Sequence, residues 1–77
     1  MDFQEIMQRI KEVISFITKK EKIKDKDIAH ALKLSPQYYA VIKRRKKIPY
    51  EAIAYFCVQY NISMNWILLK HHRQNLN

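Results

Sequence analysis

The sequence predicts a compact, all-α domain of five helices, and three observations lead to this prediction. The chain has 77 residues, of which 48% are hydrophobic, which is enough for one modest core. It contains no glycine, whereas β-hairpins usually need glycine at their turns. Its apolar residues recur at spacings of three and four, which is the period of a helix with one buried face.

The first predicted helix occupies the N-terminal segment and ends in the charged stretch Lys19–Lys24. Asp2 is its expected N-cap, with Glu5 three residues later as in a capping box. The charged stretch is predicted to be a loop, with Ile23 turned into the core. The inward stripe of this helix consists of Phe3, Ile6, Met7, Ile10, Val13, Ile14 and Ile17.

Two short helices joined by a tight turn are predicted next. Asp25 is the expected N-cap of the first, and Leu34 is expected to pack in the turn. Ser35 caps the second, with Pro36 at its first position, where a missing N–H costs no hydrogen bond. The inward residues are Ile28, Ala29 and Leu32 in the first helix, and Tyr39 and Ile42 in the second.

A fourth helix opens at Pro49 and ends near Asn61, and a fifth begins after Ser63. Ile62 and Ile67 have the spacing of a hydrophobic staple around Ser63. We expect one domain over residues 1–70 and a frayed tail over residues 71–77. The inward residues are Ala52, Ile53, Phe56, Cys57 and Tyr60 in the fourth helix, and Trp66, Ile67 and either Leu68 or Leu69 in the fifth.

The third helix, residues 36–44, has an unusual outward face. With Tyr39 and Ile42 defining the buried direction, a step of 100° per residue places small and polar side chains opposite. An exposed Val41 there indicates contact with something apolar, such as a thymine methyl group, although single exposed apolar residues are common. The outward residues are Pro36, Gln37, Ala40, Val41 and Arg44, with Tyr38 and Lys43 on the flanks.

Positive charge is concentrated in the second half of the chain. Residues 1–27 hold seven basic and six acidic residues, a net charge of +1, whereas residues 28–77 hold eight basic residues and only Glu51, a net charge of +7. Five cations stand together at 43–47. Such a distribution favours a polyanionic partner, although a basic surface kept for solubility is the alternative.

Residues 28–51, IAHALKLSPQYYAVIKRRKKIPYE, resemble the helix-turn-helix of lambda-repressor-like proteins, above all that of phage CI repressors. The shared features are Ala29, an apolar Leu34, Ser35 at the start of the second helix, and a basic turn before Ile48-Pro49-Tyr50-Glu51. The later segment YNISMNWILL resembles the closing element of that family, and the resemblance covers roughly residues 5–70. It implies a transcriptional repressor of phage or prophage type that binds a specific DNA sequence.

The resemblance implies base-edge contacts from the outward face of helix 36–44, namely from Pro36, Gln37, Ala40, Val41 and Arg44. Gln37 is the strongest candidate, because its amide can pair with adenine N6 and N7. Contacts to the DNA backbone are expected from Tyr38, Lys43, Arg45, Lys46 and Lys47. The family commonly has glycine where this chain has Lys33, so we expect Lys33 to adopt a positive φ at a cost of about 1 kcal/mol.

The expected partner is double-stranded DNA, bound by a homodimer on a palindromic operator, because a single module buries little surface. The fifth helix, through Trp66 and Leu69, is one candidate for the dimer contact. Two alternatives are a protein-interaction module such as an antitoxin, and a basic protein that binds nucleic acid of any sequence. An enzyme is the least expected class.

We expect no cofactor, metal, membrane span or small-molecule substrate. Cys57 is the only cysteine, and His30, His71 and His72 lack partners at metal-ligand spacing. The longest apolar runs fall far short of the roughly 20 residues that span a membrane. The cytoplasm of a bacterium or a phage-infected cell is therefore the expected location.

Overall fold

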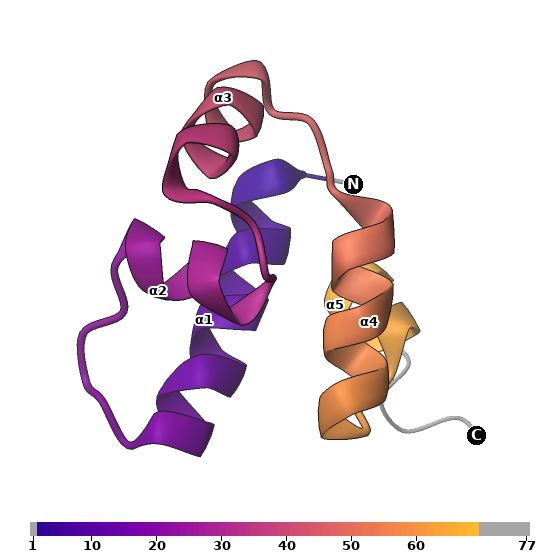
Figure 1. Ribbon diagram of the computed structural model, residues 1–77. Coiled ribbons are helices and arrows are strands. Elements are labelled where there is room, and N and C mark those ends of the chain that lie inside the picture. Colours follow the sequence, from indigo (N-terminus) through magenta and orange to yellow (C-terminus); the bar gives the residue numbers. More distant parts are fainter. Residues whose placement is uncertain (1, 70–77) are drawn as a thin grey trace.

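The computed structural model describes residues 2–69, which form five helices and no strand (Figure 1). The all-α prediction is therefore confirmed. The helices are α1 (Phe3–Thr18), α2 (Asp25–Ala31), α3 (Pro36–Arg45), α4 (Tyr50–Tyr60) and α5 (Met64–Leu69). The predicted tail, residues 71–77, lies outside the described residues.

The core is shared by all five helices, and α1 contributes most to it. Phe3, Ile6, Met7, Ile10 and Ile14 of the predicted stripe of α1 are buried, whereas Val13 is half-buried and Ile17 is 41% exposed. Trp66, expected in the core, is only half-buried. The other helices bury Ile28, Ala29, Tyr39, Ile42, Ile53, Phe56, Cys57 and Ile67.

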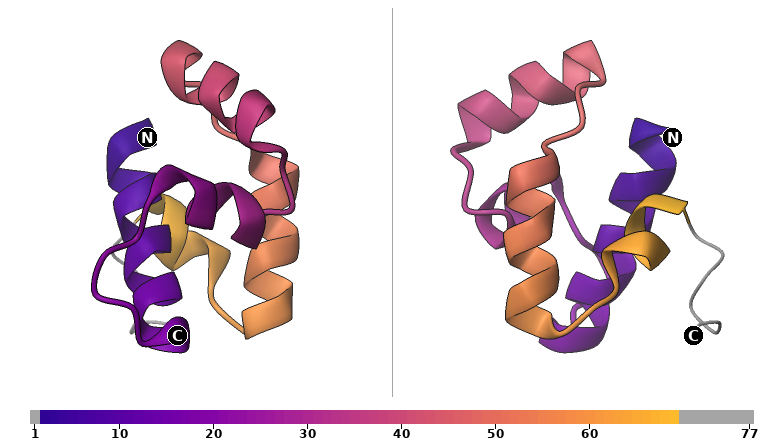
Figure 2. Two further views of the ribbon diagram at one scale, coloured as in Figure 1. Left: turned by 60° about the vertical axis from the view of Figure 1, so that its left-hand side comes forward. Right: turned by 90° about the vertical axis from the view of Figure 1, so that its right-hand side faces the viewer.

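The helices divide into a body and a projecting element. α5 packs against both α1 and α4, and α2 joins this body through α1. α3 packs chiefly against α2 and lies at one end of the molecule, at the top in every view (Figures 1 and 2). The fold therefore presents α3 to solvent along most of its length.

A buried arginine connects the two ends of the described chain. The Arg9 side chain is 7% exposed, and its Nε donates a 2.7 Å hydrogen bond to the carbonyl oxygen of Ile67. Its Nη2 donates a longer bond of 3.4 Å to the carbonyl oxygen of Leu68. A cation is favourable there, because the last carbonyl groups of a helix carry partial negative charge. The sequence did not predict this interaction.

Three of the four predicted N-caps are confirmed. The Asp2 carboxylate accepts a bond from the Gln4 N–H, and the hydroxyl oxygens of Ser35 and Ser63 accept bonds from Tyr38 and Trp66. The prediction for Asp25 is wrong, because Lys24 occupies the N-cap position of α2 and Asp25 is its first helical residue.

The capping role expected of Asp25 falls to another carboxylate. Asp27 Oδ2 accepts a 2.9 Å bond from the Lys24 backbone N–H, which closes the first turn of α2 from within. This bond, and next the Lys20 ammonium group, hold the pKa of Asp27 below its usual range. Asp25 is left free to form a different contact, with α3.

Four helices end in a residue of left-handed backbone conformation, although the chain has no glycine. The residues are Lys19, Lys33, Lys46 and Asn61, with φ between 55° and 65°. The positive φ expected at Lys33 is therefore confirmed. Around Lys33 the N–H groups of Lys33 and Leu34 donate to the carbonyl oxygens of His30 and Ala29, at 3.0 and 2.8 Å. This pair of bonds is a Schellman motif, and it ends α2 and turns the chain into α3.

The left-handed lysine leads to a testable prediction about stability. Lys33→Gly should raise the free energy of unfolding by about 0.5–1 kcal/mol, because relief of the left-handed strain exceeds the entropy that glycine adds to the unfolded chain. Urea unfolding of the two proteins measures the difference. Lys33→Ala keeps the Cβ atom and is the matched control, so an equal gain from alanine would contradict this explanation.

Candidate functional site

The candidate site is the exposed side of α3, and two buried side chains fix its direction. Tyr39 and Ile42 are each 2% exposed, and the Tyr39 ring lies 6.4 Å from the Phe3 ring of α1. Ser35 caps the helix at a fixed position, and the Schellman motif fixes the turn before it. The opposite side of α3 is therefore held toward solvent in one orientation.

The structure brings the predicted base-contacting residues together on that side. Pro36, Gln37, Ala40 and Arg44 are exposed, whereas Val41 is half-buried and not fully exposed as expected. Their spacing along a helix places them on one face. The face is shallow at Ala40 and Val41, with an amide near the start of α3 and a guanidinium group near its end.

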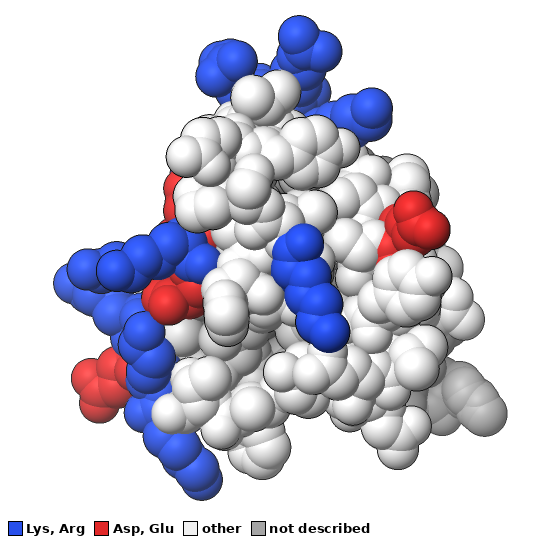
Figure 3. All heavy atoms as spheres, in the orientation of Figure 1, with Lys and Arg blue, Asp and Glu red and all other residues white. Residues whose placement is uncertain are grey.

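The predicted backbone-contacting residues surround this face. Tyr38 is 48% exposed on one flank, and all five cations from Lys43 to Lys47 are exposed. Basic side chains gather over the far end of α3, at the top of Figure 3. Cations at a helix C-terminus also interact favourably with the helix dipole, so the run is compatible with the helix that carries it.

The backbone beneath the cationic run is well defined. Lys46 has a left-handed φ of 55°, and the Lys47 N–H donates a 2.9 Å bond to the carbonyl oxygen of Ile42. This is the same pattern of helix ending as at Lys33. The side chains of Arg45, Lys46 and Lys47 therefore extend from a fixed turn at the end of α3.

Lys43 differs from the other cations of the run, because it forms an ion pair. Its Nζ lies 2.7 Å from Oδ2 of Asp25, the first residue of α2, and both side chains are about half exposed. A second pair joins Lys20 Nζ to Asp27 Oδ1 at 3.1 Å. Both carboxylates at the start of α2 are thus matched by lysines from outside this helix, and neither pair was predicted from the sequence.

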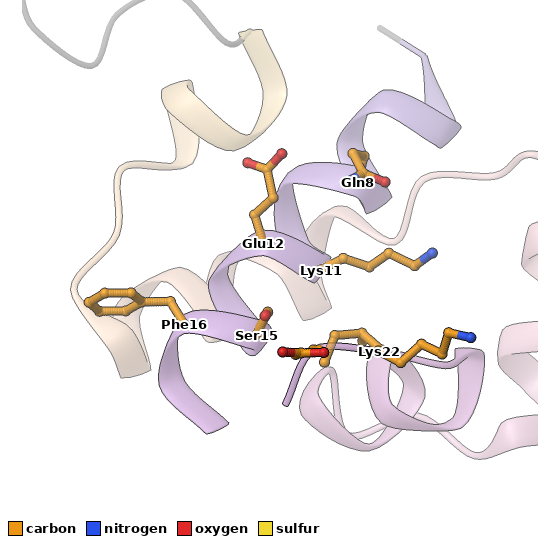
Figure 4. Close-up of a pocket in the computed structure, with 8 residues that line it drawn as sticks. Gln8, Lys11, Glu12, Ser15, Phe16 and Lys22 are labelled. Carbon is orange, nitrogen blue, oxygen red and sulfur yellow. The ribbon is translucent and has the colours of Figure 1, made fainter. Parts of the chain in front are cut away.

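An open depression of about 550 Å³ lies between α1 and the loop that follows it, but it does not assemble a reactive site. The Glu12 carboxylate points to one side of it, and the Lys11 and Lys22 ammonium groups point to another (Figure 4). The Ser15 hydroxyl, also in its wall, donates a 2.6 Å bond to the carbonyl oxygen of Lys20. Its polar groups therefore do not converge on a common point.

The residues considered for metal or covalent chemistry lie apart. Within residues 2–69, no group of three or more His, Cys, Asp and Glu side chains is placed to hold a metal ion. Cys57 is buried, and burial raises the pKa of its thiol, which disfavours the reactive thiolate. His30 is exposed, and His71 and His72 lie outside the described residues. None of the helices in the described part could cross a membrane.

Comparison with models of known protein families gave no match to this chain. Comparison with curated proteins and with solved structures gave no match either.

The buried tyrosine of α3 leads to a prediction about pH. Burial, aided by the nearby Asp25 carboxylate, raises the pKa of Tyr39 from 10.0 to about 12. The unfolded chain therefore loses this proton at a lower pH than the folded protein does. As pH rises from about 10 to about 12, the free energy of unfolding should fall.

Tyr39→Phe should remove the part of this fall that Tyr39 causes, because phenylalanine does not ionise. Denaturant unfolding at several pH values between 9 and about 12 measures the fall in the free energy of unfolding. This range includes the ordinary tyrosine pKa of about 10. Tyr55→Phe is the control, since it removes the hydroxyl group of a tyrosine that is 68% exposed. Identical profiles for Tyr39→Phe and the unsubstituted protein would contradict the assignment.

Proposed function

We propose that this protein is a sequence-specific DNA-binding transcriptional regulator of the lambda-repressor-like kind, which places α3 in the major groove. One observation carries the proposal. α3 is held through two buried residues at one end of the molecule, exposes a shallow polar face, and ends in five exposed cations. A helix-turn-helix docks in this way, with its second helix in the groove and its first helix across the backbone.

The exposed face of α3 matches the chemistry of base edges. The Gln37 amide offers a donor and an acceptor, as adenine requires, and the Arg44 guanidinium group can pair with guanine O6 and N7. Ala40 and the half-buried Val41 leave space for a thymine methyl group. The proposed specificity therefore comes from Gln37 and Arg44, with Pro36, Ala40 and Val41 shaping the contact.

The residues beyond this face suit the phosphate backbone. Arg45, Lys46 and Lys47 extend from the end of α3, and Tyr38 offers a hydroxyl group on its flank. Contacts of this kind fix the register of the protein on the duplex without distinguishing base pairs. The same cations also support the alternative of binding to any sequence, which differs from the main proposal only in the role of Gln37 and its neighbours.

We further propose that two copies bind a palindromic operator, with one α3 in each half-site. An apolar groove of about 430 Å³ lies beside Phe16 and Trp66, and Trp66 is one candidate for the dimer contact. It is lined by residues of the C-terminal half of α1 and of the segment from Tyr60 to Trp66, and by none of α3. The contact must leave both α3 helices on one side of the pair.

Selection of bound duplexes from a random DNA pool tests the proposed function. We expect enrichment of a motif with two inverted half-sites about one helical turn, or 10 base pairs, apart. Sedimentation of the protein with the selected duplex then reports the number of copies bound. A pool that stays random after selection would overturn sequence-specific binding, and a single copy on the duplex would overturn the dimer.

Two substitutions should separate the base contacts from the phosphate contacts. Gln37→Ala should weaken binding to the selected duplex by about 1–3 kcal/mol and relax the preference at one base pair. Lys47→Ala should weaken binding to all duplexes alike and reduce the salt slope by about one. Lys47 is preferable to Lys46, whose left-handed φ also contributes to ending the helix.

Fluorescence anisotropy with the selected duplex and with a scrambled duplex, at several salt concentrations, measures both effects. The two variants serve as controls for each other. Gln37→Ala should change the preference for the selected duplex, and Lys47→Ala should change the salt slope. Equal loss of affinity for both duplexes in Gln37→Ala would remove Gln37 from base recognition.

A further inference from the structure

The start of α2 carries charges that DNA binding does not explain. In a docked helix-turn-helix the first helix crosses the phosphate backbone, and its N-terminus would attract a phosphate. Here the first turn of α2 contains two carboxylates, Asp25 and Asp27, with one lysine, Lys26, between them. Carboxylates repel phosphates, so they weaken binding at the position where the duplex passes.

Capping of α2 does not account for Asp25. Asp27, not Asp25, accepts the Lys24 N–H and closes the first turn. The Asp25 carboxylate instead forms a 2.7 Å ion pair with Lys43, 18 residues away. Ion pairs as exposed as this one contribute little to folding stability. The pair therefore matters more for the charge that Lys43 can offer to a partner than for the stability of the fold.

Lys43 is the first of the five cations, and the pair binds its ammonium group to α2. A phosphate can recruit Lys43 only by breaking this pair, and the released Asp25 carboxylate would then lie beside the phosphate. The pair thus removes one cation from the set that can release counterions from DNA. Because both side chains are about half exposed, the pair is accessible to competing ions.

We infer that Asp25 is a specificity-determining residue, which limits sequence-indifferent binding by pairing with Lys43 and by opposing phosphates at the start of α2. The inference rests on the proposed docking of α3 in DNA. Base contacts from Gln37 are made on another face of α3, so Asp25 lowers the general affinity without lowering base recognition. The ratio of specific to non-specific binding rises as a result.

The test measures binding to a duplex of random sequence between 50 and 200 mM salt, so it does not require a known operator. Asp25→Asn should bind more tightly than the unsubstituted protein, with a salt slope steeper by about one. The ratio of its affinity to that of the unsubstituted protein should shrink about threefold across this fourfold change in salt. Lys43→Gln alone should change the slope little, and in the Asp25→Asn background it should remove the added slope.

Glu12→Gln is the matched control, because it removes one exposed carboxylate on α1, away from the α2–α3 contact. Circular dichroism and the unfolding midpoint report the fold of each variant, and Asp25→Ser is the second variant if Asp25→Asn fails to fold. Slopes that are equal in Asp25→Asn and the unsubstituted protein would overturn the inference and leave the proposed function standing. A gain in Glu12→Gln as large as that in Asp25→Asn would overturn it too, since net charge alone would then explain both. Absence of binding to any duplex at 50 mM salt would overturn both proposals.

Discussion

The position of α3 depends on one local constraint, the left-handed turn at Lys33. α3 meets the rest of the protein chiefly through α2, and it buries only Tyr39 and Ile42. With so small a contact, the angle between the two helices is set largely by the Schellman motif that joins them. A strained residue is tolerated there because the bonds from Lys33 and Leu34 satisfy carbonyl groups that the end of α2 would otherwise leave without partners.

The body of the protein needs a different kind of contact, because α5 has only six residues and buries only Ile67 fully. An isolated helix of this length is not stable in water. Arg9 compensates by donating two hydrogen bonds to the end of α5, from within the core. A buried cation needs partners, and the carbonyl oxygens of Ile67 and Leu68 supply them. The stable platform beneath α2 and α3 thus includes a polar contact between the first and last helices.

The charges near α3 fall into groups with different consequences. Arg44 lies on the polar face, and Arg45, Lys46 and Lys47 extend beyond it. Lys43 is neutralised by Asp25, and Lys20 by Asp27. Lys43 and Lys20 therefore add little to the positive charge that an anionic partner meets at the start of α2. On the proposed function, this arrangement weakens general attraction relative to base recognition.

The amino-acid sequence by itself determined the five helices, the caps at Asp2, Ser35 and Ser63, and the buried side of α3. Each of these follows from residues within about one helical turn of each other, where spacing and hydrogen-bonding capacity are sufficient. The outward face of α3 was predictable for the same reason, although a helical wheel could not show that Val41 is half-buried. Only the tertiary structure decided the pairing of Asp25 with Lys43 and the burial of Arg9 against Ile67, which is 58 residues away. No local pattern distinguishes an arginine that meets a distant carbonyl group from one that faces solvent, because its partner is supplied by the packing of another helix.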